Sequence, residues 1–294
     1  MRKFGKIKIF LVLVLLVFLG SGTVFFSRSP VLIVTDFSFE LLYGPVRLWF
    51  RGLRTSFALF RRVIPVMVSE SAGPDLVSLA VTGISSSPRA VFFPYRYLEG
   101  ALFYRERHPE IPVLVACEGN LLPGEQSVTF VTTDTAADLY RAGLYAALLA
   151  GEKQVIFFTD RYFSGENRNA FREGLRSRGF FGEPVYSQTS EDSFSQENLG
   201  CLVMAGNAAA FLEQNLSVPV ILFSWASPAY IPRTVKLIFD DSPWGLAAGA
   251  LGEFPPPGGE ILIPSEPLLL LGRMEKKSDF FRHRALLRGK MQKN

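Results

Sequence analysis

Residues 128–179 read VTFVTTDTAADLYRAGLYAALLAGEKQVIFFTDRYFSGENRNAFREGLRSRG, in which strand-like and helix-like segments alternate. The β-branched segment 128–132 predicts a short strand, and Asp134 behind it is a preferred residue for capping the start of a helix. An Ala- and Leu-rich helix is expected over residues 135–150, ending at Gly151, because glycine commonly terminates helices.

A fully apolar strand at 154–158 follows, and a second helix then ends at Gly179. Strands that are apolar on both faces are typical of parallel sheets covered by helices. The same alternation extends outward, and further buried strands are expected at 31–35, 65–69, 90–94, 112–117, 201–205, 219–223, 235–239 and 261–264. An amphipathic helix over 41–62 sets Trp49, Phe50, Leu53, Phe57 and Phe60 against arginines. The chain is therefore predicted to be an α/β protein.

The stretch described above resembles the middle of type I periplasmic binding proteins and of the effector-binding core of lac-repressor-like regulators. Residues 235–251 (VKLIFDDSPWGLAAGAL) and 261–273 are similar to the final helix and closing strand of that family. The resemblance covers about residues 31–273. It implies two Rossmann-like, doubly wound lobes, with a hinge where the chain passes between them near Thr132–Thr133 and returns near Asp240.

This interpretation divides the chain into four parts. They are an N-terminal signal-anchor segment (1–29), a first lobe (30–133 with about 240–272), a second lobe (134–239) and a basic tail (273–294).

The N-terminal segment has the pattern of a transmembrane helix. Four basic residues precede residue 9, and residues 9–26 carry no charge. Eighteen helical residues extend about 27 Å, close to the bilayer core of about 30 Å. The preceding charges place the body on the extracytoplasmic, periplasmic side. A cleaved signal peptide that releases the body into the periplasm is the alternative, although no A-x-A-like site is present.

The charge distribution argues against nucleic-acid binding. Residues 31–272 hold 18 basic against 25 acidic residues, so the folded body is acidic. No helix-turn-helix segment is found, which argues against a transcription regulator. The tail holds eight basic and two acidic residues. We expect it to be a solvated helix, with contact to anionic lipid or a partner as the alternative.

No catalytic, metal or cofactor site is predicted. The sequence has no nucleophile elbow, phosphate loop or paired acids on a strong scaffold, so we expect no enzyme activity and no cofactor. His108 and His283 lack ligand spacing, which excludes a metal site. Cys117 and Cys201 fall in strands of different lobes and are expected to be buried thiols.

Candidate ligand-binding residues follow the carboxyl ends of the strands, where ligands bind in open α/β sheets. Their loops begin at Asp36, Glu70, Tyr95 and Glu118 in the first lobe. The residues nominated are Phe37, Phe39, Tyr95, Glu118, Asp160, Arg161, Asn207, Trp225 and Asp241. Aromatic rings among carboxylates, amides and arginines suit a small polar ligand.

The resemblance adds three further candidates and two departures. Tyr43 stands where the family often stacks an aromatic ring on its ligand, and Asn167 or Arg168 stands where it has an arginine. The family usually has Asn-Asp where this chain has Gly206-Asn207. Sugar-binding members have an aspartate where this chain has Trp225. A simple sugar is therefore disfavoured, and a ring-containing ligand suits the indole better.

The function expected from these features is extracytoplasmic solute binding. The protein would close two lobes on a small ligand and work with the permease of an ABC-type membrane transporter. The alternative is a sensor or interaction protein of the cell envelope that keeps the fold without transport-grade binding.

Overall fold

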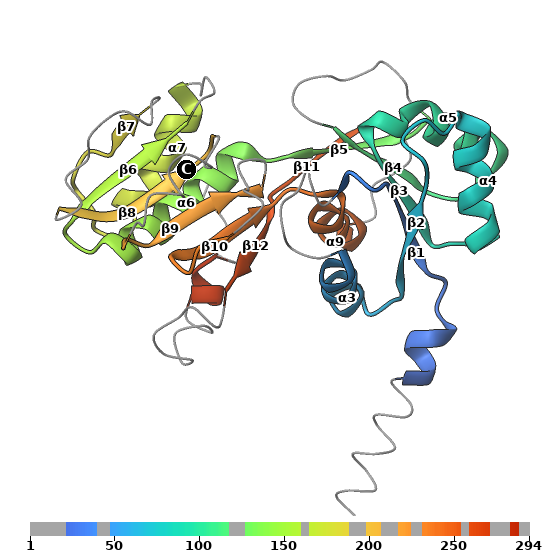
Figure 1. The fold of residues 1–294 in the computed structure, drawn as a ribbon, viewed down its shortest axis with the longest axis horizontal. Helices are drawn as coiled ribbons and strands as arrows, with labels where there is room; N and C mark the ends of the chain where they lie inside the picture. The colour runs from blue at the N-terminus through green and yellow to red at the C-terminus, as the bar shows by residue number, and fades with distance from the viewer. Residues whose placement is uncertain are drawn as a thin grey trace, which may run out of the picture.

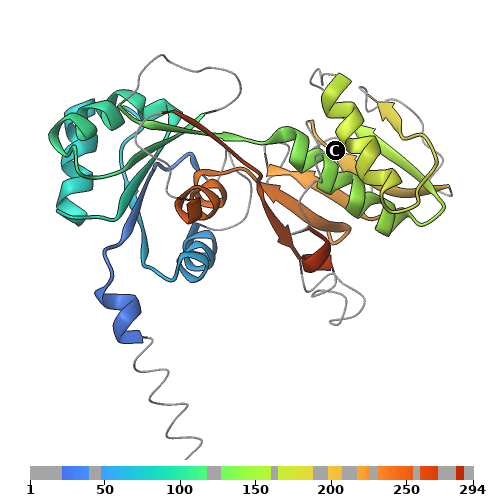
Figure 2. The ribbon, with the colours of Figure 1, turned by 180° about the vertical axis from the view of Figure 1, so that it is seen from behind.

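The chain forms two lobes, each built around a six-stranded sheet (Figure 1). The structure is a computed structural model, and it describes residues 22–39, 48–117, 127–159, 165–187, 198–206, 217–224, 231–253, 259–270 and 283–287. The view from behind shows the same two lobes joined by a few extended segments (Figure 2). The predicted α/β class and two-lobe arrangement are confirmed.

The first lobe contains an entirely parallel sheet of order β11-β5-β4-β3-β1-β2. Its strands are β1 (Val31–Thr35), β2 (Val63–Met67), β3 (Ala90–Pro94), β4 (Val113–Cys117), β5 (Thr129–Thr133) and β11 (Glu260–Ile263). Helices α4 (Pro74–Ile84) and α5 (Leu98–Arg107) cover one face, while α3 (Leu48–Leu59) and α9 (Pro243–Glu253) cover the other. Because both faces are covered, β1 and β4 are buried along their whole length.

The second lobe contains a sheet of order β12-β10-β9-β8-β6-β7. Its strands are β6 (Gln154–Phe158), β7 (Val185–Ser187), β8 (Leu199–Met204), β9 (Val220–Phe223), β10 (Val235–Asp240) and β12 (Glu266–Leu269). All neighbours are parallel except β12, which runs antiparallel to β10. Helices α6 (Thr135–Ala150) and α7 (Gly165–Arg176) pack together beside this sheet.

The contact between α6 and α7 depends on two glycines. A Cβ atom on Gly143 would lie 2.2 Å from the backbone oxygen of Phe171, and one on Gly174 would lie 2.1 Å from that of Tyr140. Real Cβ atoms do not approach so closely, so the two helix backbones touch where side chains are absent. The ends of α6 are those predicted, because Asp134 caps it by accepting from Ala137 N at 3.0 Å and Gly151 follows it with a φ of 61°.

The chain passes between the lobes three times, from β5 to α6, from β10 to α9 and from β11 to β12. The expected return of residues 240–272 to the first lobe is therefore wrong for β12. This strand pairs Leu237 with Leu269 and Asp240 with Glu266, which satisfies the backbone groups of β10 on its open side. The first lobe therefore receives α9 and β11 from this part of the chain, and β12 belongs to the second lobe.

Part of the C-terminal tail contacts the second lobe. Residues 283–287 are helical, and Leu287 is buried in the same core as Tyr145 of α6. The hydroxyl of Tyr145 lies 3.0 Å from Nδ1 of His283. The expectation of a solvated tail is wrong for this segment, because an apolar side chain finds a place in the core; the other tail residues from 273 lie outside the described part.

The N-terminal segment is described only from residue 22, and residues 22–27 are helical. In the described part of the chain, no helix is long and apolar enough to cross a membrane. The expected span over residues 9–26 lies mostly outside that part. Cys117 and Cys201 are buried thiols in sheets of different lobes, as predicted.

Candidate functional site

The carboxyl edges of the two sheets face each other. β5 ends at Thr133 and leads directly into α6 of the second lobe, so the carboxyl edge of the first parallel sheet faces that lobe. β10 ends at Asp240 and leads into α9 of the first lobe, so the carboxyl edge of the second sheet faces back. Polar side chains on these two edges are therefore directed toward the opposite lobe, and open α/β sheets usually bind their ligands beyond such an edge.

On the first edge, the carboxylate of Asp36 organises a hydrogen-bonded network. Its Oδ1 accepts from Ser38 N at 2.9 Å and Ser38 Oγ at 2.6 Å. Its Oδ2 accepts from Arg96 Nη1 and Tyr97 OH, both at 2.8 Å. β1 and β3 are parallel neighbours, so Asp36 after β1 lies beside the 3-10 turn η1 (Tyr95–Tyr97) after β3. This turn directs both Arg96 and Tyr97 onto the end of β1.

The network keeps Asp36 ionised. Burial raises the pKa of its carboxyl group, but hydrogen bonds from Ser38 and Tyr97 and the charge of Arg96 outweigh burial and lower that pKa below its ordinary value. Burial and the hydrogen bond to Asp36 raise the pKa of Tyr97, so the phenol keeps its proton and acts as a donor. The network is thus a stable carboxylate surrounded by donors.

Arg96 is the part of this network that a ligand can reach. Its side chain is 40% exposed, and its hydrogen bonds to Asp36 and Ser38 both use Nη1. Asp36 therefore fixes a guanidinium group that stays partly exposed to solvent. A fixed guanidinium is suited to bind a carboxylate or another oxygen acceptor. Phe37 and Tyr95, next to the network in sequence, are 84% and 37% exposed.

On the second edge, Ser224 at the end of β9 contacts Asp241 after β10. The Ser224 hydroxyl donates to Oδ1 of Asp241 and accepts from Asp241 N at 3.2 Å. Burial raises the pKa of Asp241 to about 7, and the charges of Asp240 and Asp138 add to this effect, although the hydrogen bond from Ser224 opposes it. Asp241 thus changes its charge near neutral pH.

Buried ion pairs hold the hinge between these edges. Arg51 of α3 donates to Asp240 and, at 2.8 Å, to Ser242 Oγ. Arg141 of α6 donates to Asp138 and, at 2.7 Å, to the backbone oxygen of Ser265. The Arg51–Asp240 pair joins the β10-to-α9 connection to the first lobe. The contacts of Arg141 join the β11-to-β12 connection to the second lobe.

An opening with an empty volume of about 320 Å³ lies beside the first hinge pair. Its walls come from α3, α9, β10 and β12, and they include Phe50, Arg54, Thr55, Trp244, Glu266 and Leu268. None of the nominated ligand residues that the structure describes lines it. It therefore belongs to the hinge and not to the facing carboxyl edges.

Apart from Phe39, the predicted ligand-binding residues that the structure describes lie on the first edge, on the second edge and at the start of α7. Phe37 and Tyr95 lie on the first edge, and Asp241 lies on the second. Asn167 and Arg168 lie in the first turn of α7, with the guanidinium of Arg168 5.1 Å from the ring centroid of Tyr186. Tyr43, Glu118, Asp160, Arg161, Asn207 and Trp225 lie outside the described residues.

The structure corrects the expectation that Phe39 contacts ligand. Its side chain is instead buried in the core between α9 and the first sheet. Its ring meets that of Trp244 edge-on, with centroids 6.3 Å apart. Its role is therefore packing.

The sequence predicted that the loops containing Asp36, Arg96 and Ser224 border the ligand site. These three residues themselves were not among the predicted ligand-binding residues. Charged side chains directly after two neighbouring strands were a usable signal for Asp36 and Arg96. No signal in the sequence pointed to Tyr97, because the 3-10 turn that aims its hydroxyl at Asp36 is set by tertiary packing.

No family model matches the sequence, and a search of curated proteins finds no match. Among solved structures, an ABC transporter system solute-binding protein from Conexibacter woesei DSM 14684 is similar, with a TM-score of 0.52 and 16% identity over 89% of this chain and 95% of that one. A transcriptional activator of the comK gene from Bacillus halodurans has a TM-score of 0.50 and 11% identity over 89% and 98% of the two chains.

This protein has the type I periplasmic-binding-protein fold. The resemblance inferred from residues 128–179 is thereby confirmed at the level of the fold. An ABC transporter periplasmic solute-binding protein from Actinobacillus succinogenes 130z with bound D-allose also matches, with a TM-score of 0.44 and 12% identity over 87% and 100% of the chains. In this fold the Asp36 network and the Ser224–Asp241 pair lie on opposite sides of the hinge.

Proposed function

We propose that this protein is an extracytoplasmic solute-binding protein that closes its two lobes on a small ligand for an ABC transporter. The observation that carries the proposal is the Arg96 guanidinium, which Asp36 holds at the carboxyl edge facing the second lobe. The similarity to an ABC transporter system solute-binding protein supports the same function. The three chain passages provide the hinge that lobe closure requires.

The first lobe would bind the acceptor end of the ligand. Arg96 offers N–H donors to a carboxylate or to another group with paired oxygen acceptors. Phe37 and Tyr95 supply exposed rings close to it in the chain, which suits a ligand that carries an apolar or planar part. The ligand class proposed is a small acid or polar ring compound, and a simple sugar remains disfavoured.

The second lobe would complete the site on closure. Asp241 lies on the edge that faces Arg96, and its position beside Ser224 holds the carboxyl group in place. Asn167 and Arg168 start the helix that follows β6 on the same edge. Trp225 follows Ser224 directly in sequence and is proposed as a further wall.

Membrane attachment forms part of the proposal. The uncharged segment 9–26 would anchor the protein in the cell membrane with both lobes on the extracytoplasmic side. A cleaved signal peptide would give the same body in the periplasm. Either arrangement places the ligand site outside the cytoplasm, as a transporter-linked binding protein requires.

Thermal unfolding with a ligand panel tests this function. The panel contains small carboxylates, amino acids, nucleosides and sugars. A ligand that binds only the folded protein stabilises it by about 2.7 kcal/mol at a hundredfold excess over Kd. We expect one class of acids or polar ring compounds to raise the Tm, and Arg96→Gln to weaken that binding by about 10- to 100-fold through the lost charge-assisted hydrogen bonds.

Arg178→Gln, which removes an exposed arginine just after α7, is the matched control and should bind like the unchanged protein. No stabilisation by any class would argue against solute binding and for an interaction role in the envelope. Equal binding by Arg96→Gln would show that the ligand site lies elsewhere.

A further inference from the structure

Helix α3 exposes its apolar side chains. Trp49, Leu53 and Phe57 follow each other at intervals of four residues, so they form one stripe along the helix. Trp49 and Phe57 are 63% and 71% exposed, and Phe50 and Leu53 are nearly half exposed. Large apolar side chains gathered in this way on a surface mark an interaction site.

The buried face of α3 is the more polar one. Gly52 packs against Trp244, Thr55 donates to the backbone oxygen of Trp244 at 3.1 Å, and Arg51 reaches Asp240. The usual amphipathic pattern is thus reversed, and packing within the lobe does not account for the aromatic stripe.

The stripe continues into the end of the N-terminal apolar segment. The rings of Phe25 and Phe60 meet with centroids 5.9 Å apart, and Phe26 is exposed beside them. The helix over residues 22–27 and α3 lie on the same side of the first lobe in both views (Figure 1; Figure 2). We define the α3 face by Val24, Phe26, Trp49, Phe50, Leu53, Phe57 and Phe60.

Basic residues border this face. The Arg28 guanidinium lies 5.3 Å from the ring centroid of Phe60, and Arg61 donates to the backbone oxygen of Ser29 at 3.4 Å. The backbone N–H of Arg89 donates to the backbone oxygen of Pro30 at 2.8 Å, so Arg89 also lies beside the segment that carries Arg28. The positive charges of Arg28 and Arg89 add to burial in lowering the pKa of Arg61. Aromatic rings edged by arginine are typical of surfaces that bind anionic lipid headgroups.

The short chain between Phe26 and β1 limits how far the α3 face can lie from the end of the segment 9–26. Only residues 27–30 separate them, and four extended residues reach at most about 14 Å. If the segment 9–26 spans the membrane, the amino end of β1 must lie close to the bilayer surface. The end of α3 lies at that same edge, because Val31 N donates to the backbone oxygen of Arg62 at 2.9 Å.

We propose that the α3 face docks on the surface of a bilayer containing anionic lipid, the bilayer in which residues 9–26 are anchored. This rests on the anchoring part of the proposed function. Docking holds the first lobe against the membrane and leaves the second lobe free to move about the hinge. The aromatic rings lie at the headgroup level, and Arg28, Arg61 and Arg89 contact the lipid phosphates.

A site-specific fluorescent label tests the docking in the full chain. Phe57→Cys carries a polarity-sensitive label, while Cys117 and Cys201 are buried and react slowly. The protein is reconstituted in vesicles of phosphatidylcholine and phosphatidylglycerol that contain a headgroup-level quenching lipid. The control is Leu79→Cys, an exposed position on α4 that covers the opposite face of the first sheet. We expect quenching and a blue shift at residue 57 and neither at residue 79.

Flotation of the same samples separates the two proposals. Protein that floats with the vesicles while the label at residue 57 stays unquenched would overturn docking and leave the anchor intact. Protein that does not float would overturn both. Shielding of residue 57 that needs another protein of native membranes, or that rises with protein concentration without lipid, would assign the face to a protein partner or a second copy and overturn lipid docking.

Discussion

Arg51 of α3 forms an ion pair with Asp240 at the end of β10, and this pair joins the two lobes at their hinge. The two side chains are only 2% and 4% exposed. Ser242 contributes a second acceptor for Arg51 at 2.8 Å, and its backbone N–H donates to Asp240 Oδ1 at 3.2 Å. The pair is therefore buried and hydrogen-bonded, so that each of its charged groups faces a partner in place of water.

Removal of Arg51 should destabilise the protein strongly. Arg51→Ala leaves Asp240 buried without its principal cation, and we expect a loss of about 3–5 kcal/mol in the free energy of unfolding. Arg54→Ala is the control, because the Arg54–Glu266 pair is 30% and 38% exposed and should contribute about 1 kcal/mol or less. Denaturant unfolding measures both, and equal losses would contradict the role given to the buried pair.

Because α6 and α7 touch at glycines, we expect a glycine-to-alanine substitution at this contact to destabilise the protein, although alanine normally favours a helix. Gly143→Ala places a methyl group against the backbone of Phe171 and should destabilise by about 1–3 kcal/mol. Gly83→Ala, near the end of α4, meets no atom within 4 Å and should stabilise by about 0.5–1 kcal/mol through reduced chain entropy. Unfolding of the two variants side by side tests this; a neutral Gly143→Ala would mean that the helices can separate without loss.

Because the pKa of Asp241 is raised, we expect its contribution to the free energy of unfolding to fall as the pH rises toward neutrality. Burial raises its pKa from 3.8 to about 7, and that of Asp138 to about 6. The folded state therefore retains protons that the unfolded chain releases. This contribution to stability is complete below pH 3.8 and is lost as the pH rises to about 7. Asp36 acts in the opposite direction, because its lowered pKa adds stability that is lost in acid.

The variant Asp241→Asn should flatten the fall in unfolding free energy between mildly acidic and neutral pH. Glu152→Gln, on the exposed turn after α6, is the control and should leave the profile unchanged. The measurement is denaturant unfolding over a series of pH values. An unchanged profile in Asp241→Asn would show that this carboxyl group is ionised in the folded protein throughout.

Parts of the fold with strong local signals were predictable from sequence. The strand Val31–Thr35 and the helix Thr135–Ala150 were expected with the observed boundaries, since continuous apolar residues define the first and Asp134 and Gly151 delimit the second. The reversed face of α3 was not predictable in the same way. Periodicity shows that a helix has an apolar side, but not whether that side meets the core or the outside.

The features that sequence reasoning missed depend on contacts between distant residues. β12 has four residues and contains Pro267, so its pairing with β10 leaves no recognisable strand pattern. The Asp36–Tyr97 hydrogen bond spans 61 positions and exists only because β1 and β3 are neighbours. Burial of Leu287 in the second lobe likewise depends on a surface formed mainly by α6 and its sheet.

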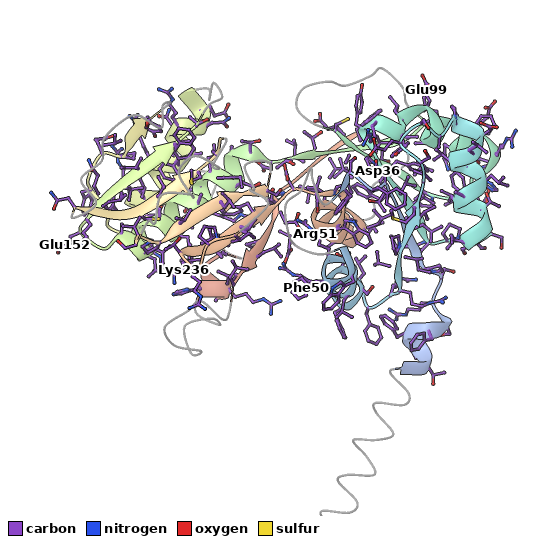
Figure 3. The ribbon with its side chains drawn as sticks, viewed as in Figure 1. Asp36, Phe50, Arg51, Glu99, Glu152 and Lys236 are labelled. Carbon is purple, nitrogen blue, oxygen red and sulfur yellow. The ribbon has the colours of Figure 1, made fainter. Side chains whose placement is uncertain are left out.

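Lobe closure is tested most directly by a distance between two labels. Glu99 and Glu152 are exposed and lie on different lobes (Figure 3). The variant Glu99→Cys/Glu152→Cys carries a donor and an acceptor dye, and energy transfer is recorded with each stabilising compound of the panel. We predict that the ligand changes the energy transfer as the lobes close, and that Arg96→Gln in the same background abolishes the change at that ligand concentration. Ligand binding with unchanged energy transfer would contradict closure of the two lobes on a ligand.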